Sequence, residues 1–202
     1  SWTGRLNGKL KLMSCKINAL ISGTVRPIAG SLLVAGALFC FGLMSSHAQT
    51  VDASTALTYV IDGNSVTITD CDESASGVLV IPSSYNGNPV TSIGREAFVG
   101  CASLTSVTIP ASVTTVGQSI FRFCSSLTVI EVDAGNANYS AEDGVLFNKD
   151  KTTLVSFGGG KSGSYAVPDT VVFINSSSFE SCDTLTSVTI PSSVTSIGFT
   201  AL

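Results

Sequence analysis

Apolar residues recur along this chain of 202 residues at a fixed spacing of 23 positions. The same pattern opens four times, with steps of 23, 58 and 23 residues, at Val90, Val113, Val171 and Val194. Repetition at a period of roughly 20–50 residues is typical of repeat architectures. We therefore expect stacked units, with an insertion of 35 residues inside the longer step.

Each unit contains a short predicted strand, which spans Leu104–Pro110 in the first complete unit. Side chains alternate between the two faces of a strand, so Leu104, Val107 and Ile109 are expected to point inward. Ser106 and Thr108 would then point outward. Proline ends the strand because it lacks the backbone donor that a sheet requires.

The residues after each strand form the return path to the next unit, and they include Val113, Val116 and Phe121 in the second unit. One unit cannot bury both its strand and its return path, so neighbouring units must cover each other. Full burial contributes about 1.5–3 kcal/mol per large apolar side chain, which makes stacking strongly favourable.

The insertion, at about 133–169, carries a hairpin signal of its own. Two apolar runs, 144–147 and 153–157, flank a polar turn at 148–151. The glycine run 158–160 is interpreted as a flexible exit.

Residues 49–88 are expected to form an N-terminal β-cap. A hairpin is predicted over 57–69, with its turn at Asp62-Gly63. The run 77–82 (GVLVIP) has the pattern of a degenerate first repeat, and regular repeats would occupy 89–202.

Residues 1–48 have the three parts of a secretory signal peptide, and Met13 is the expected initiator. Basic residues precede an apolar run at 28–44, and a small-x-small cleavage site follows at 46–48. An uncleaved anchor is the alternative, because 17 apolar residues lie at the lower limit for crossing a bilayer. We expect a secreted or cell-surface protein.

The segment Val90–Pro110 (VTSIGREAFVGCASLTSVTIP) resembles the BspA-like class of leucine-rich repeats. The likeness extends over 66–202 and includes 138–140 and 143–147 in the insertion. It implies a right-handed solenoid with short parallel strands and mostly irregular or short-helical return segments, in bacterial surface or secreted proteins that bind other proteins. The family offers no catalytic residues to transfer. The last unit stops at Leu202 without a strand or a cap, so we expect a chain truncated at its C-terminus.

The single histidine, His47, lies at the predicted cleavage site. A chain that starts at Gln49 would have no Ser-His-Asp or Cys-His pair and few options for zinc. We therefore expect no enzyme, no cofactor and no metal site. Calcium is the alternative at the acidic clusters 70–73 and 142–143, but their spacing matches no dedicated calcium loop, so solvated turns are favoured.

Four cysteines follow the signal segment, at positions 71, 101, 124 and 182. Equivalent positions on successive turns would have Cβ atoms about 4.8 Å apart, whereas a disulfide prefers about 3.8 Å. A structural ladder of buried thiols at Cys101, Cys124 and Cys182 is favoured over disulfides.

After residue 48 the chain has fourteen acidic and five basic residues, a formal charge of −9. This charge repels phosphate backbones and disfavours nucleic acid as a partner. Contact with a membrane is expected only through the N-terminal segment.

The outward strand positions form a candidate concave binding face, because repeat proteins bind through such surfaces. They are Ser106, Thr108, Val129, Glu131, Ser187 and Thr189. Tyr139 and Tyr165 in the insertion are further candidates, and the expected partner is an extracellular protein or glycan. Three alternatives stay open: small polar residues that only fill exposed positions, a spacer that displays another domain, and binding to ice or crystal surfaces.

Overall fold

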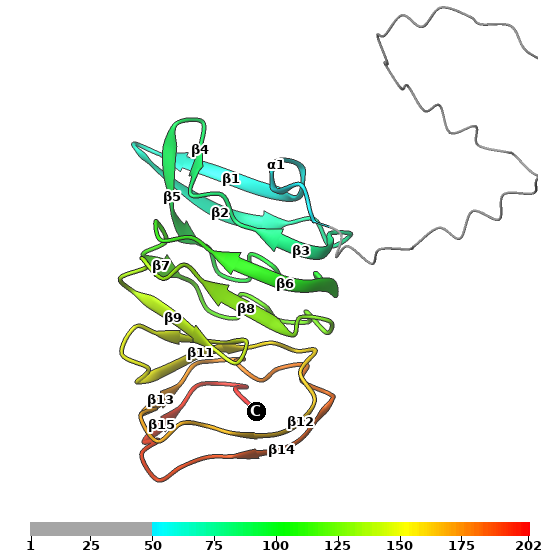
Figure 1. Ribbon diagram of the computed structural model, residues 1–202, viewed down its shortest axis with the longest axis vertical. Coiled ribbons are helices and arrows are strands. Elements are labelled where there is room, and N and C mark those ends of the chain that lie inside the picture. The colour runs from blue at the N-terminus through cyan, green and yellow to red at the C-terminus, as the bar shows by residue number, and fades with distance from the viewer. Residues whose placement is uncertain (1–49) are drawn as a thin grey trace, which may run out of the picture. The chain divides into compact units, whose positions relative to one another are not determined.

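The computed structural model describes residues 50–202, which belong to one compact unit, Ser45–Leu202 (Figure 1). The predicted signal segment, 1–48, and Met13 lie outside the described residues. Within 50–202, none of the helical structure has the length and apolar character needed to cross a membrane.

Parallel strands on successive turns form the front of the stack (Figure 1). We call β3 (Ser76–Val80), β6 (Ser103–Ile109) and β8 (Val129–Val132) the front sheet. Val107 on β6 pairs with Leu79 on β3 and with Ile130 on β8, and all three are buried. The predicted strand and its inward positions are confirmed.

The front strands contain an irregularity that simple alternation does not predict. Leu104 and Val107 are both fully buried although three positions separate them. The register between β3 and β6 shifts at this point, so that Thr105 and Ser106 both lie on the outer side. Such an extra residue is the mark of a β-bulge.

The return segments differ from the expectation of irregular or short-helical structure, because they contain a second row of short strands. These are β5 (Asn88–Ile93), β7 (Thr115–Val116), β13 (Phe173–Ile174) and β15 (Ser196–Ile197). Adjacent β-branched and aromatic residues favour extended backbone at these positions. In the described residues the only helix is α1 (Ala53–Ala56), at the start of the stack.

Each return segment then turns at a residue with left-handed backbone, and a second such residue follows four positions later at Gly100, Phe123 and Ser181. The φ angles are 57°, 56°, 54° and 50° at the equivalent positions Glu96, Ser119, Ser177 and Thr200. A left-handed residue interrupts a right-handed helix, which explains why turns replace helices here.

The first turns are covered by the predicted hairpin, formed by β1 (Leu57–Asp62) and β2 (Ser65–Cys71). Gly63 supplies the left-handed turn residue, with a φ of 58°. β2 pairs in parallel with β5, so the hairpin extends the row of return strands. β4 (Ser84–Tyr85) forms a second small hairpin with β5.

The insertion contains three antiparallel strands, β9 (Tyr139–Glu142), β10 (Val145–Asn148) and β11 (Thr153–Phe157). The predicted hairpin is β10–β11, and β9 is additional. β11 then pairs in parallel with the return strand β13. β12 (Gly163–Ala166) pairs in parallel with β14 (Leu185–Thr189), so the second half of the insertion is a turn of the solenoid.

The β10–β11 hairpin separates two hydrophobic cores and is buried on both faces. Leu146 and Val155 pack into the first core, with Leu127 and Ile130. The opposite side of the hairpin contributes to the second core the residues Val145, Phe147, Leu154 and Phe157. The insertion is therefore a structural part of the stack that lies between its two hydrophobic cores.

The interpretation of Gly158–Gly160 as a flexible exit is wrong. The run is packed against the preceding turn, and the Gly160 amide donates to the carbonyl oxygen of Leu127 at 2.9 Å. A Cβ atom on Gly159 would lie 2.8 Å from the Cys124 carbonyl oxygen and 3.3 Å from that of Ser181. These glycines allow close contact between backbones, which no other residue permits.

Candidate binding surfaces

The outer side of the front sheet brings four of the predicted site residues together. Ser106 pairs with Val129, and Thr108 pairs with Glu131. The Thr108 hydroxyl lies 3.4 Å from Oε2 of Glu131, and Val129 is 39% exposed. These residues form two columns that run across β6 and β8, one of Ser106 and Val129 and the other of Thr108 and Glu131.

Both columns continue onto β3 through two residues that the sequence interpretation missed. Val78 pairs with Ser106, and Val80 pairs with Thr108. Val80 is 51% exposed. The run 77–82 had been recognised as a degenerate repeat, so applying the same alternation to it would have found both valines.

The other two predicted strand positions, Ser187 and Thr189, lie on the separate β12–β14 pair. Ser187 pairs with Ser164, and Thr189 pairs with Ala166. The front of the stack is therefore interrupted between β8 and β12, and the six candidate strand positions do not form one continuous sheet.

A cleft of about 520 Å³ lies at this interruption. It is lined by Thr128, Val129, Asp143, Gly144, Phe157, Lys161, Ser162, Ser164, Tyr165 and Leu185. Two predicted site residues from different parts of the sequence, Val129 and Tyr165, meet here. The mixture of apolar side chains with a few polar groups is typical of binding sites.

The turn between β9 and β10 forms part of the cleft lining. Asp143 and Gly144 have left-handed φ angles of 49° and 70°, as a tight hairpin turn requires. A Cβ atom on Gly144 would lie 2.4 Å from the Thr128 carbonyl oxygen, so this turn fits closely against β8. The Lys161 ammonium donates to the Asp143 carbonyl oxygen and lies 5.8 Å from the Phe157 ring centre.

Tyr165 forms the aromatic wall of the cleft. Its ring meets Phe157 edge-on at 4.8 Å between centres, and Phe179 lies 6.2 Å away. Burial raises the pKa of Tyr165 to about 12, and the carboxylates of Asp143 and Glu142 add to the increase. The phenol is therefore neutral at physiological pH and experiences a negative electrostatic potential.

Tyr139, the other predicted aromatic site residue, is half-buried and engaged within the fold. Its hydroxyl accepts a hydrogen bond from the Val116 amide at 2.9 Å. Asn136, a buried residue that the sequence did not single out, accepts from the Tyr139 amide and donates to the Val113 carbonyl oxygen, both at 2.9 Å. These contacts attach the insertion to the return segment of the second repeat.

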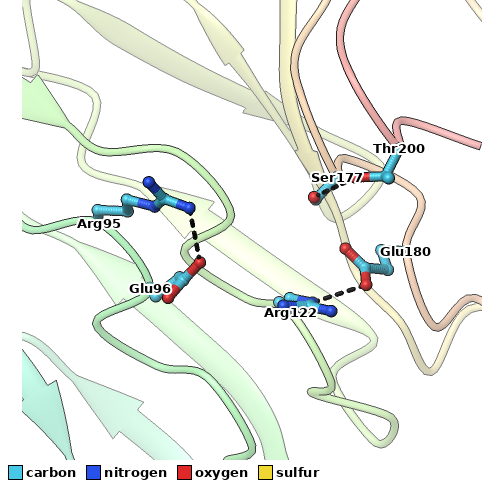
Figure 2. A network of polar contacts seen from close by, with 6 residues as sticks. All are labelled: Arg95, Glu96, Arg122, Ser177, Glu180 and Thr200. Carbon is cyan, nitrogen blue, oxygen red and sulfur yellow. Dashed lines mark hydrogen bonds and ion pairs between the residues drawn. The ribbon is translucent and has the colours of Figure 1, made fainter.

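A second, polar hollow of about 250 Å³ lies along the turns of the return segments (Figure 2). Its charged side chains point toward one another. Arg122 Nε lies 2.6 Å from Glu180 Oε1, and Arg95 Nη2 lies 3.2 Å from Glu96 Oε1. Because these charged side chains already pair with each other, they are less available to a ligand. The front cleft is therefore the better candidate binding site.

The predicted ladder of thiols contains Cys101 and Cys124 but not Cys182. The thiols of Cys101 and Cys124 are buried and donate to carbonyl oxygens of the preceding turn, those of Cys71 at 3.6 Å and Phe98 at 3.0 Å. Gly159 lies between the backbones of Cys124 and Ser181, so the inserted turn separates Cys182 from the ladder. The ladder instead starts one turn earlier, at Cys71.

The ladder thiols are poor nucleophiles. Burial raises the pKa of Cys124 to about 12, and the neighbouring thiol of Cys71 raises the pKa of Cys101 well above its usual range. Protonated thiols react slowly, because the thiolate is the reactive form.

The acidic cluster at 70–73 lies at the end of β2 and at the start of the turn that follows. The Asp72 carboxylate accepts from the Ser74 amide at 2.8 Å, and hydrogen bonds from Ser74 lower the pKa of Asp72. Throughout residues 50–202, no three His, Cys, Asp or Glu side chains are grouped in a way that could hold a metal ion.

The fold defines a leucine-rich-repeat solenoid. Residues 155–202 match the family model described as "BspA type Leucine rich repeat region (6 copies)", which confirms the predicted resemblance for this part of the chain. Such repeats are generally non-enzymatic protein-interaction modules of bacterial proteins, typically at the cell surface.

Solved structures of bacterial leucine-rich-repeat proteins are similar to the chain. A leucine-rich repeat protein from Eubacterium ventriosum ATCC 27560 is 22% identical, with a TM-score of 0.53 over 75% of this chain and 62% of that one. The pneumococcal vaccine antigen PcpA is 19% identical, with a TM-score of 0.48 over 72% and 65%. A leucine rich cell surface protein from Faecalibacterium prausnitzii A2-165 is 16% identical, with a TM-score of 0.41 over 76% and 74%.

The chain thus spans less than two thirds of the length of the first two of these structures. No match was found among curated protein sequences. The similarity to the Eubacterium protein establishes the fold.

Proposed function

We propose that the chain is a non-catalytic binding module of a secreted or cell-surface protein, and that it binds an extracellular protein or glycan at the front cleft. The observation that carries this proposal is the meeting of Val129 on β8 with Tyr165 on β12 at one solvent-open cleft. An exposed valine, a half-buried tyrosine and nearby serine hydroxyls offer apolar contact together with hydrogen bonding. Tyrosine is favoured at interfaces because one side chain supplies both.

The outer columns of the front sheet extend this surface. Val129 belongs to both the cleft and the column that contains Ser106 and Val78. A partner seated in the cleft would therefore also contact the sheet. Repeat proteins commonly use such extended faces.

The binding test uses the purified chain, immobilised and exposed to a panel of extracellular-matrix proteins and to a glycan array. Val129→Arg fills the cleft mouth with a bulky charged side chain, and Val172→Arg is the matched control, because Val172 is similarly exposed, at 43%, outside the cleft. We expect saturable binding that Val129→Arg weakens by about tenfold or more, as for the loss of a central contact. Equal weakening by both variants would refute the cleft, and no saturable binding to any probe would favour the spacer alternative.

The proposed location rests on the sequence of residues 1–48 and on the class of repeat. A fusion of these residues to a periplasm-dependent alkaline phosphatase tests it in a bacterial host. We expect enzyme activity with the native segment and none with Val34→Arg, which places a charge in the apolar run. Equal activity from the two fusions would contradict export through this segment.

A further inference from the structure

The interruption of the front sheet leaves one edge of β12 without a strand partner among residues 50–202, because β12 pairs only with β14. The edge of β8 that faces the insertion is covered instead, since the β9–β10 turn packs with Gly144 against the backbone of Thr128 and Val129. The earlier front strands, by contrast, pair directly from one turn to the next. An unpaired edge presents a row of N–H and C=O groups that can pair with another extended chain.

The cleft beside this edge has room for the side chains of such a segment. Val129 and Leu185 offer apolar contact, Tyr165 an aromatic ring, and Ser162 and Ser164 hydroxyl groups. Its volume of about 520 Å³ lies within the usual range for ligand sites, about 300–1,000 Å³.

The distribution of charged residues indicates the sign of the partner's charge, because every basic side chain in residues 50–202 already contacts another group of the fold. Three of them form ion pairs, Arg95 with Glu96, Arg122 with Glu180 and Lys151 with Glu142. The other two donate to backbone carbonyl oxygens, Lys149 to Asn136 and Lys161 to Asp143.

The acidic side chains are in large excess. Of the fourteen carboxylates, only those of Glu96, Glu142 and Glu180 have a basic partner among the described residues. Inside the cleft Asp143 and Lys161 balance each other, and Glu131 on β8 and Asp183 before β14 add exposed negative charge on the flanking strands. A surface of this kind attracts a cationic partner.

We propose that the cleft between β8 and β12 binds an extended, basic peptide segment of a partner protein, which pairs as an added strand with the free edge of β12. The proposal rests on the proposed binding function and narrows it to one class of partner. Main-chain hydrogen bonds along the strand edge supply affinity, and the acidic surroundings select for lysine and arginine.

The probe is a short synthetic peptide of alternating lysine and valine, titrated to millimolar concentration into the isotope-labelled chain while amide chemical shifts are recorded. A peptide with glutamate in place of lysine tests charge, and one with alternate backbone N-methyl groups tests strand pairing. We expect saturable shifts at β8 and β12 for the first peptide only, weakening as salt rises.

Two matched variants locate the binding. Ser164→Lys adds a positive charge in the cleft, and Ser84→Lys adds the same charge on β4, at the other end of the stack and outside the cleft lining (Figure 1). Both serines are exposed, so both variants are expected to fold. We expect Ser164→Lys to weaken peptide binding by about tenfold and Ser84→Lys to change it by less than about threefold.

The inference is overturned if the basic peptide causes no saturable shifts, if the glutamate or N-methyl peptide binds equally well, or if the two variants weaken binding equally. The proposed function survives this result when a matrix protein or glycan still binds the chain in a manner sensitive to Val129→Arg. Binding of glycans alone at the cleft would identify the other class of ligand and exclude the peptide.

Discussion

Arg122 Nε lies 2.6 Å from Glu180 Oε1, although 58 positions separate the two residues in the sequence. They occupy the same position of successive complete repeats, on either side of the inserted turn. The inserted turn runs directly from Phe157 into Gly158–Gly160 and has no equivalent of the return-segment turn. The ion pair therefore bridges a gap that the insertion leaves in this edge of the stack (Figure 2).

Arg122→Ala is expected to lower the free energy of unfolding by about 1 kcal/mol, the upper range for a partly exposed ion pair. The two side chains are 36% and 21% exposed, so solvent screens the interaction in part. Urea denaturation at low and high salt measures the effect, which should shrink at high salt. Arg95→Ala, which removes the more exposed pair with Glu96, is the control and should cost less than about 0.5 kcal/mol. Equal losses for the two variants would contradict the bridging role.

Gly159→Ala is expected to lower the free energy of unfolding by about 2 kcal/mol, as overpacking does in tight interiors. The added methyl group would meet the Cys124 carbonyl oxygen at 2.8 Å, and backbone cannot move aside easily. Gly135→Ala is the control, because its Cβ would meet only side chains, at 3.2 Å or more. Thermal and urea unfolding of the three proteins measures the difference. A neutral Gly159→Ala would restore the flexible-exit interpretation.

The sequence predicted the elements whose signal is local. Alternation identified the inward positions Val107 and Ile109, and the Asp62-Gly63 and 148–151 turns identified two hairpins. The return strands β7, β13 and β15 escaped prediction because two residues are too few to show a period.

The arrangement of the insertion depends on pairing between distant segments, which local patterns do not specify. The parallel pairing of β11 with β13 and of β12 with β14 turns the insertion into part of the stack. A run of glycines is equally compatible with a hinge and with close backbone packing, so Gly158–Gly160 was ambiguous in the sequence. The cleft arises where a pairing is missing, and for this reason no motif in the sequence predicts it.

Tyr139→Phe is expected to lower the free energy of unfolding by about 1 kcal/mol, because it removes the acceptor of the Val116 amide. Tyr85→Phe is the control: Tyr85 stacks on Tyr59 at 3.9 Å, and its hydroxyl makes no hydrogen bond within residues 50–202. Hydrogen exchange adds a local readout, in which the Val116 amide should lose protection only in Tyr139→Phe. If Tyr139 served binding alone, its removal would leave both measurements unchanged.

The buried thiol of Cys124 is expected to make the fold less stable as the pH rises through the alkaline range. Its pKa rises from an ordinary value of 9.0 to about 12, mainly because burial disfavours the thiolate. The native state therefore holds this proton more tightly than the unfolded state does. The corresponding stability is fully present below pH 9.0 and is lost as the pH rises toward 12.

We expect the free energy of unfolding to fall between about pH 9 and pH 12, with Cys124 contributing up to about 1.4 kcal/mol per pH unit above its unfolded pKa. Cys124→Ala should make this dependence less steep, and Cys101, Cys182 and Tyr165, whose pKa values are also raised, leave part of it. Val113→Ala is the control, since it creates a cavity at another fully buried position without removing a titrating group. Urea unfolding across this pH range compares the slopes, and a slope in Cys124→Ala as steep as in Val113→Ala would mean that the Cys124 thiol is not held protonated by burial.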